Sequence, residues 1–137
     1  MLEQNLTISS RPTSLLILGI TLLLFGIFAF LGSILLWGKG SIFNPPSEVD
    51  LSFPITDIVV NAPASIITGI GLIKMRNWSK FLAWFVAGFY IYASVEIFID
   101  VIQEGILLPE IVIPQIFAII VAIFLMIETH RYEETFT

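Results

Sequence analysis

The sequence predicts an all-α membrane protein in which four transmembrane helices form one antiparallel bundle. The 137 residues are 57% hydrophobic and only 12% charged, whereas roughly a quarter of the residues of a typical soluble domain carry charge. Four apolar runs are bounded by glycine, proline or charged residues. Each run is near the length needed to cross a hydrocarbon core of ~30 Å. We therefore expect a single domain, 1–137, with spans at about 15–37, 55–73, 81–101 and 111–127.

The first predicted span, 15–37, contains no charged residue. Pro12 suits the first turn of its helix, where a missing N–H leaves no hydrogen bond unmade. The run exceeds the about 7–15 apolar residues of a signal peptide, so we expect it to be retained as a span. The segment 38–54 follows, with helix-breaking glycines and prolines and two acidic residues. It is predicted to be an extracytoplasmic loop.

The second predicted span carries polar or small residues at intervals of four: Asp57, Asn61, Ser65 and Gly69. This spacing places them on one helix face. Small and hydroxyl residues line the packing seams of membrane helices, because lipid provides no hydrophobic drive for association. We therefore expect Ser65, Thr68 and Gly69 to pack against another helix. Pro63 is expected to disturb the helix, since it frees a carbonyl one turn earlier.

A basic hairpin, 74–80, separates the second and third spans. Its Lys74, Arg76, Trp78 and Lys80 have the character of lipid-headgroup anchors at a membrane interface. The third span has a four-spaced face of its own: Trp84, Gly88, Tyr92, Glu96 and Asp100. In the last span Pro114 lies early, where a missing donor costs least. The residues after this span form a short and highly polar tail, in which we expect His130 to be an ordinary solvated residue.

The positions of the six lysines and arginines predict the orientation. Short cytoplasmic segments are enriched in these residues. With four spans, the N-terminus, the hairpin 74–80 and the C-terminus share one side of the membrane. That side would hold every lysine and arginine except Lys39. We therefore expect the hairpin and both termini to be cytoplasmic.

A cluster of polar side chains is predicted near the extracytoplasmic side. Antiparallel second and third spans bring Asp57 and Asn61 to the height of Glu96 and Asp100, and Gln115 enters the fourth span at that height. Such a cluster could hold a proton, or a hard cation through oxygen ligands. A carboxylate inside a membrane is expensive and commonly functional. The alternative is that both aspartates are wet interfacial groups and that Glu96 is simply hydrogen-bonded within the bundle.

The residue inventory argues against several function classes. The net charge of −5 disfavours nucleic-acid binding, which depends on basic patches. With no cysteine and one histidine, the usual zinc sites are excluded, and we expect no cofactor. His130 lies on the opposite side from the carboxylates, so no Ser-His-Asp arrangement can form with them. We expect no enzymatic activity.

The hairpin from Gly69 to Ala83 resembles that of many small prokaryotic four-span integral membrane proteins. In those, a glycine-containing span ends in a basic residue, and a tryptophan with a second basic residue opens the next span. The resemblance implies a prokaryotic inner (plasma) membrane and no particular activity. Size and span count are also similar to those of the small multidrug transporters. Those carry an essential carboxylate in the first span, however, and 15–37 contains none.

Two function classes remain open. The first is a structural or accessory subunit that packs through its small-residue faces into a homo-oligomer or a larger membrane complex. The second is a small transporter or channel that couples protons or cations to Glu96, Asp57 and Asp100. A lipid or small-molecule sensor is a third, more distant alternative. The orientation of Glu96 discriminates the first two, because a coupling residue must face an enclosed cavity beside Asn61 and Gln115.

Overall fold

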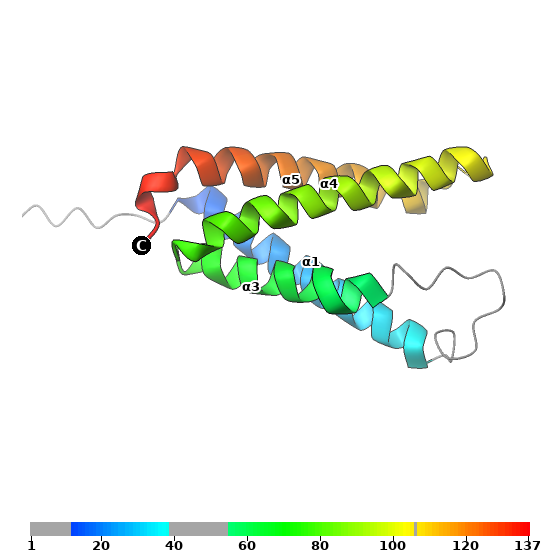
Figure 1. Cartoon of the computed structure of the whole chain (residues 1–137), viewed down its shortest axis with the longest axis horizontal. Helices are drawn as coiled ribbons and strands as arrows, with labels where there is room; N and C mark the ends of the chain where they lie inside the picture. Colours follow the sequence, from blue (N-terminus) through cyan, green and yellow to red (C-terminus); the bar gives the residue numbers. More distant parts are fainter. Residues whose placement is uncertain (1–11, 39–54, 106) are drawn as a thin grey trace, which may run out of the picture.

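The computed structural model describes residues 12–38, 55–105 and 107–137, and within them every regular element is helical. The elements are α1 (Thr13–Gly38), the π-helical turn η1 (Asp57–Asn61), α3 (Ala62–Ile73), α4 (Trp78–Glu104), α5 (Pro109–Arg131) and the 3-10 turn η2 (Glu133–Thr135) (Figure 1). In this described part, α1, α4 and α5 are long and apolar enough to cross a membrane, and η1 with α3 makes a shorter apolar helix. The all-helical, membrane-compatible fold is confirmed. The predicted loop 38–54 lies almost entirely outside the described residues.

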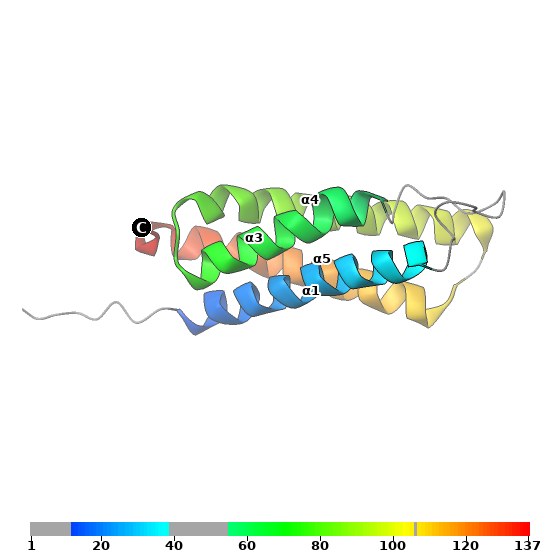
Figure 2. The same cartoon turned by 90° about the horizontal axis from the view of Figure 1, so that it is seen from below.

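The helices lie side by side along the long axis, and successive helices run in opposite directions (Figures 1 and 2). They form two pairs: α1 packs along α3, and α4 packs along α5. The pairs meet mainly through α3 and α4, whereas α1 and α5 touch only slightly. Figure 1 shows the two pairs diverging toward the end where α3 begins and α4 ends.

Glycines bring α1 and α3 into close contact. A methyl group placed on Gly69 would lie 2.6 Å from the carbonyl oxygen of Gly19, and one on Gly26 would lie 2.9 Å from that of Ala62. Backbones can approach this closely only where neither helix has a side chain in the way. Ser65 and Thr68 are fully buried beside this seam. The expectation that these residues of the second span form a packing face is therefore confirmed.

The apolar core fills the half of the bundle near the α3–α4 connection. Its largest fully buried side chains are Leu15, Leu22, Leu72, Val86 and Leu125. These residues come from the start of α1, the end of α3, the first half of α4 and the second half of α5. The outer faces of the same helices expose large apolar side chains such as Leu35 and Phe81. An outer surface of this kind matches a lipid surrounding.

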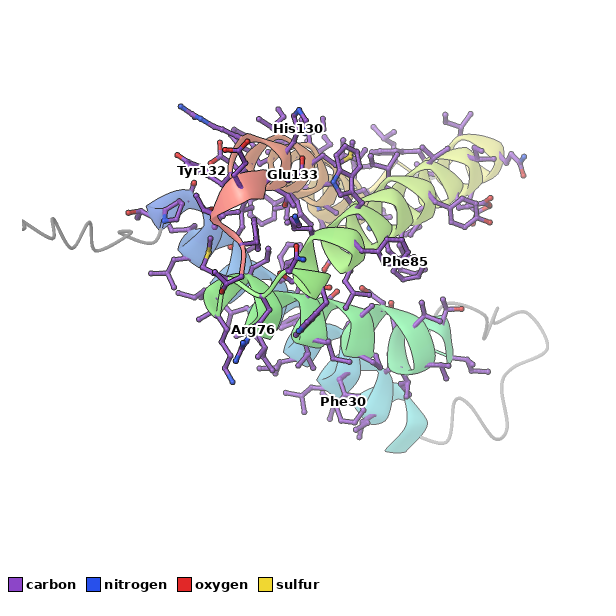
Figure 3. All side chains as sticks on the ribbon, turned by 60° about the vertical axis from the view of Figure 1, so that its left-hand side comes forward. Phe30, Arg76, Phe85, His130, Tyr132 and Glu133 are labelled. Atoms are coloured by element: carbon purple, nitrogen blue, oxygen red, sulfur yellow. The ribbon has the colours of Figure 1, made fainter. Side chains whose placement is uncertain are left out.

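The C-terminal residues close this end of the bundle. The Thr137 N–H donates to the Met75 carbonyl, and the Asn77 N–H donates to the Thr137 carbonyl, both at 2.9 Å. Phe136 is buried beneath them, with the Lys80 ammonium 5.9 Å from the centre of its ring. Figure 3 shows Tyr132 and Glu133 at the same end of the molecule as Arg76. The tail is docked, whereas the sequence indicated only that it is polar.

The last helix continues past the predicted end of its span at 127. It ends at Arg131, and Glu128 is buried, whereas His130 is exposed, as expected. The Ser14 hydroxyl donates a hydrogen bond to Glu128, and Arg131 lies 3.7 Å from the same carboxylate. Polar residues mark where a membrane ends and need not end a helix. His130 and Arg131 lie in the last turn, where the negative end of the helix dipole stabilises a positive charge.

Candidate functional site: an acid-lined cleft

A cleft of about 1070 Å³ opens where the two helix pairs diverge. Its walls come from α1, η1, α4 and α5. All five members of the predicted polar cluster line it: Asp57, Asn61, Glu96, Asp100 and Gln115. The structure therefore brings these side chains together around one volume, although they come from separate helices. That they form a proton or cation site remains a prediction.

The π turn η1 shapes the first wall of the cleft. Pro63 has no N–H to donate to the helix, and the preceding turn widens so that the Ala62 N–H donates to the Asp57 carbonyl, five residues back. Such π turns inside helices occur frequently at functional sites. In this turn the Asn61 side-chain amide donates to Asp57 Oδ1 at 2.8 Å. The expected disturbance at Pro63 is present, as a π turn that aligns Asp57 with Asn61.

A chain of hydrogen bonds runs from Asp57 into the bundle. Ser65 Oγ donates to Asn61 Oδ1 at 3.1 Å, and Ser65 Oγ lies 2.7 Å from the Tyr90 hydroxyl. Because the Ser65 proton is directed to Asn61, the Tyr90 hydroxyl is the donor to Ser65. Every donor in the chain then points toward the Asp57 carboxylate, which only accepts. The chain links a partly exposed carboxylate to a buried tyrosine.

The opposite wall is formed by α4 and α5. The buried Ser94 hydroxyl lies 3.2 Å from Gln115 Oε1 and 3.4 Å from the Gln115 carbonyl, and it donates to both oxygens. Tyr92 and Glu96 lie one turn apart on α4, and both line the cleft. Asp100 is exposed at the outer end of this wall. Glu96 therefore lines the same open cleft as Asn61 and Gln115, and Asp100 is exposed at its edge.

Aromatic rings form the floor of the cleft. Phe25 on α1 contacts Tyr90 on α4, with ring centres 5.8 Å apart, and Phe117 on α5 in an edge-to-face contact at 5.6 Å. The packed core begins directly beyond these rings. The cleft is therefore blind in this conformation and does not continue through the bundle.

The charges of the described residues are separated along the bundle. Lys74, Arg76, Lys80 and Arg131 lie at the end opposite to the cleft, and the ion pairs found within residues 12–38, 55–105 and 107–137 also lie there. The three cleft carboxylates have no lysine or arginine near them in this part of the chain. A low-dielectric wall strengthens the field of unpaired charges. Within the described residues, the cleft therefore gathers carboxylates with no basic side chain among its lining.

The carboxylates surround the cleft without converging on one point. Among the described residues, no group of three or more histidine, cysteine, aspartate or glutamate side chains is placed to hold a metal ion. Calcium requires six to eight oxygen ligands at about 2.3–2.6 Å. Within the described residues, the cleft carboxylates are spread around the cavity and do not form such a set.

The predicted headgroup anchors differ in their surroundings. Lys74 and Arg76 are exposed, as an anchor requires. Lys80 is half-buried and donates to the Glu133 carbonyl at 3.3 Å, so it also holds the tail. Trp78 is half-exposed and one edge of its indole lies over Gly71. Their role at a lipid surface remains a prediction.

Sequence reasoning missed three residues that shape the cleft: Phe25, Ser94 and Phe117. The sequence did contain a pattern that includes Ser94, since Val86, Tyr90 and Ser94 are spaced four residues apart. In the structure all three are buried. This stripe is offset by two residues from the face that begins at Trp84, most of which is exposed. The two phenylalanines carry no such signal, since both spans are rich in apolar residues.

Replacing Tyr90 with phenylalanine tests the hydrogen-bond chain. We expect Tyr90→Phe to lower the free energy of unfolding by about 1 kcal/mol, because one buried donor to Ser65 is lost while the ring packing is retained. Tyr92→Phe is the matched control, since the Tyr92 side chain is largely exposed and should change stability much less. Denaturant unfolding in mixed micelles measures both. Equal effects of the two variants on stability would contradict the hydrogen-bond chain from Tyr90 to Asp57.

The chain was compared with protein families, curated proteins and solved structures. No family model, curated protein or solved structure matches it.

Proposed function

We propose that this chain is a four-span integral membrane protein of a prokaryotic plasma membrane. The N-terminus, the hairpin 74–80 and the C-terminus lie in the cytoplasm, and the cleft opens on the extracytoplasmic side. Two observations support this topology. Three described helices are long and apolar enough to span, and the described lysines and arginines gather at one end of the bundle, as cytoplasmic ends require.

We further propose that the cleft binds a cationic molecule with an apolar body, as the binding site of a small cation- or proton-coupled transporter. One observation carries the proposal: carboxylates and amides from η1, α4 and α5 line a single cavity in which the described residues supply no positive charge. The aromatic walls suit the apolar part of such a ligand, and ring faces attract cations. The volume, about 1070 Å³, is at the upper end of the range for drug-sized ligands.

The position of Glu96 favours this function over a purely structural one. The side chain lines the cleft together with Asn61 and Gln115. In a purely structural protein, a carboxylate in the bundle would raise the free energy of the folded state and have no function to offset that cost. In a cation-binding site the same carboxylate lowers the free energy of the bound state.

The proposal is tested by thermal unfolding of the purified protein in lipid nanodiscs, with tetraphenylphosphonium as the probe. We expect a saturable rise in the unfolding midpoint, since a ligand at about 100 times its Kd stabilises by about 2.7 kcal/mol. Tetraphenylborate, an anion of the same shape, should give no rise. Empty nanodiscs correct for partitioning into lipid. Equal shifts with both probes, or none with either, would reject a cation-selective cleft.

A subunit of a homo-oligomer is a second candidate, and one observation favours it. A methyl group placed on Gly88 would meet no atom within 4 Å, and this gap lies between the exposed Trp84 and Tyr92. Such an open position on α4 can receive a helix of a second copy. If it does, crosslinking in membranes should trap a dimer of the unaltered protein and no dimer of Gly88→Leu. A dimer that survives the substitution would remove this candidate.

A further inference from the structure

A second cavity, of about 340 Å³, lies between α1 and α5. Its apolar walls include Ile17, Leu18, Ile120 and Phe124, and it also contains Thr21. The groove reaches Ser14 and Glu128, near the cytoplasmic end in the topology proposed above. It therefore joins an apolar passage to a buried carboxylate, and its size would admit a small organic cation.

One ring separates this groove from the acid-lined cleft. Phe117 lines both cavities, and its edge-to-face partner across the seam is Phe25 of α1, with ring centres 5.6 Å apart. The seam between α1 and α5 is also the one along which neighbouring helices touch least.

We propose that the groove is a second binding station for the cation taken up by the cleft. Glu128 supplies its carboxylate, and the Phe25–Phe117 pair is the barrier between the two stations. The inference rests on the proposed function of the cleft and extends it to a path along the α1–α5 seam. A cation that passes the barrier leaves the carboxylates of one end and meets Glu128 at the other.

Glu128 has a competing structural role that the test must separate. It accepts a hydrogen bond from Ser14 in the first turn of α1, where the helix dipole favours a negative charge, and its other oxygen lies 3.7 Å from Arg131. The hydrogen bond would hold α5 to α1 with no ligand present. A purely structural contact between α1 and α5 explains the hydrogen bond, but it does not explain why a groove extends from the carboxylate to Phe117.

Cysteine accessibility provides the test, because the chain has no cysteine of its own. Ala93→Cys reports on the cleft and Thr21→Cys on the groove. Right-side-out vesicles are treated from outside with a membrane-impermeant thiosulfonate that carries a quaternary ammonium, and in parallel with a sulfonate analogue. We expect Ala93→Cys to react with a preference for the cationic reagent, and Thr21→Cys to react slowly.

Adding Phe117→Ala should open the barrier and speed the labelling of Thr21→Cys from outside by about tenfold, because an aromatic contact is lost. Ile123→Ala, a similarly exposed position on α5 that lines neither cavity, is the matched control and should change nothing. In the opened variant, Glu128→Gln should abolish the preference for the cationic reagent at Thr21→Cys, while the Ser14 hydrogen bond can still form.

Each other outcome has a distinct meaning. If Phe117→Ala leaves Thr21→Cys slow, or if Thr21→Cys already reacts fast without it, the ring pair is no barrier and the inference is overturned. If the preference for the cationic reagent survives Glu128→Gln, Glu128 has only a structural role and the second station is rejected. If Ala93→Cys itself shows no cationic preference, the proposed function of the cleft fails instead. Thermal unfolding of each variant confirms that it is folded.

Discussion

Gly69→Leu should lower the free energy of unfolding by about 3 kcal/mol, at the upper end of the usual cost of overpacking. The first added carbon would already lie 2.6 Å from the Gly19 carbonyl oxygen and 3.0 Å from the side chain of Leu23. A carbonyl oxygen in the opposing helix cannot move without displacing that helix, so α1 and α3 must separate. Unfolding in mixed micelles, followed by circular dichroism, measures the loss.

Gly32→Leu is the matched control on α1. A carbon added at Gly32 meets no atom within 4 Å, so only the change in helix propensity remains. Leucine is a better helix former than glycine, which is about 1 kcal/mol less favourable than alanine. We therefore expect Gly32→Leu to be neutral or slightly stabilising. A similar loss at both positions would show that close approach along the α1–α3 seam is not what makes Gly69 sensitive.

Neutralising the cleft carboxylates should produce the second large effect. Glu96→Gln and Asp57→Asn are each expected to weaken tetraphenylphosphonium binding about tenfold. A unit charge several ångströms from the cation contributes a few kcal/mol at an effective dielectric constant of about 20, and the cost of desolvating the charges offsets part of this. The double variant should bind about a hundredfold more weakly if the two contributions add. Equilibrium dialysis against nanodiscs measures the affinity.

Glu134→Gln is the charge-matched control, because Glu134 is exposed at the opposite end of the bundle. It removes one negative charge from the protein without changing the cleft, and affinity should be unchanged. The ligand-free stability of the cleft variants should not fall, since each substitution retains an oxygen acceptor and relieves repulsion between like charges. Equal weakening by Glu134→Gln would mean that net charge, and not the cleft, attracts the cation.

The grouping of the cleft residues could be predicted because it depends only on helical rise and chain direction. Asp57 is near the start of one apolar run, Glu96 near the end of the next and Gln115 near the start of the last. Alternating directions place all three at one height, whichever helices are neighbours. The structure has this arrangement, and the π turn at Asp57 does not alter it.

The contacts that sequence reasoning missed depend on which helices pair and on their rotation. The outer faces of α1 and α5 are as apolar as their inner faces, so no contrast in polarity singles out Phe25 or Phe117. Lipid solvates all such faces equally well, and packing detail decides the pairing. The burial of Glu128 could not be predicted for a related reason, because its partner Ser14 lies 114 residues away.

The length of the second apolar helix has a consequence for the surrounding bilayer. Ile55 and Thr56 are helical as well, so the described helix extends over residues 55–73. These residues rise about 28 Å at 1.5 Å per residue, close to the ~30 Å of the hydrocarbon core. Asp57 is near one end of this rise, so in the proposed topology it lies close to the membrane surface, where water and headgroups reach it. A thicker bilayer would place Asp57 deeper among lipid tails. Occupancy of the cleft would then depend on the acyl-chain length of the host lipid.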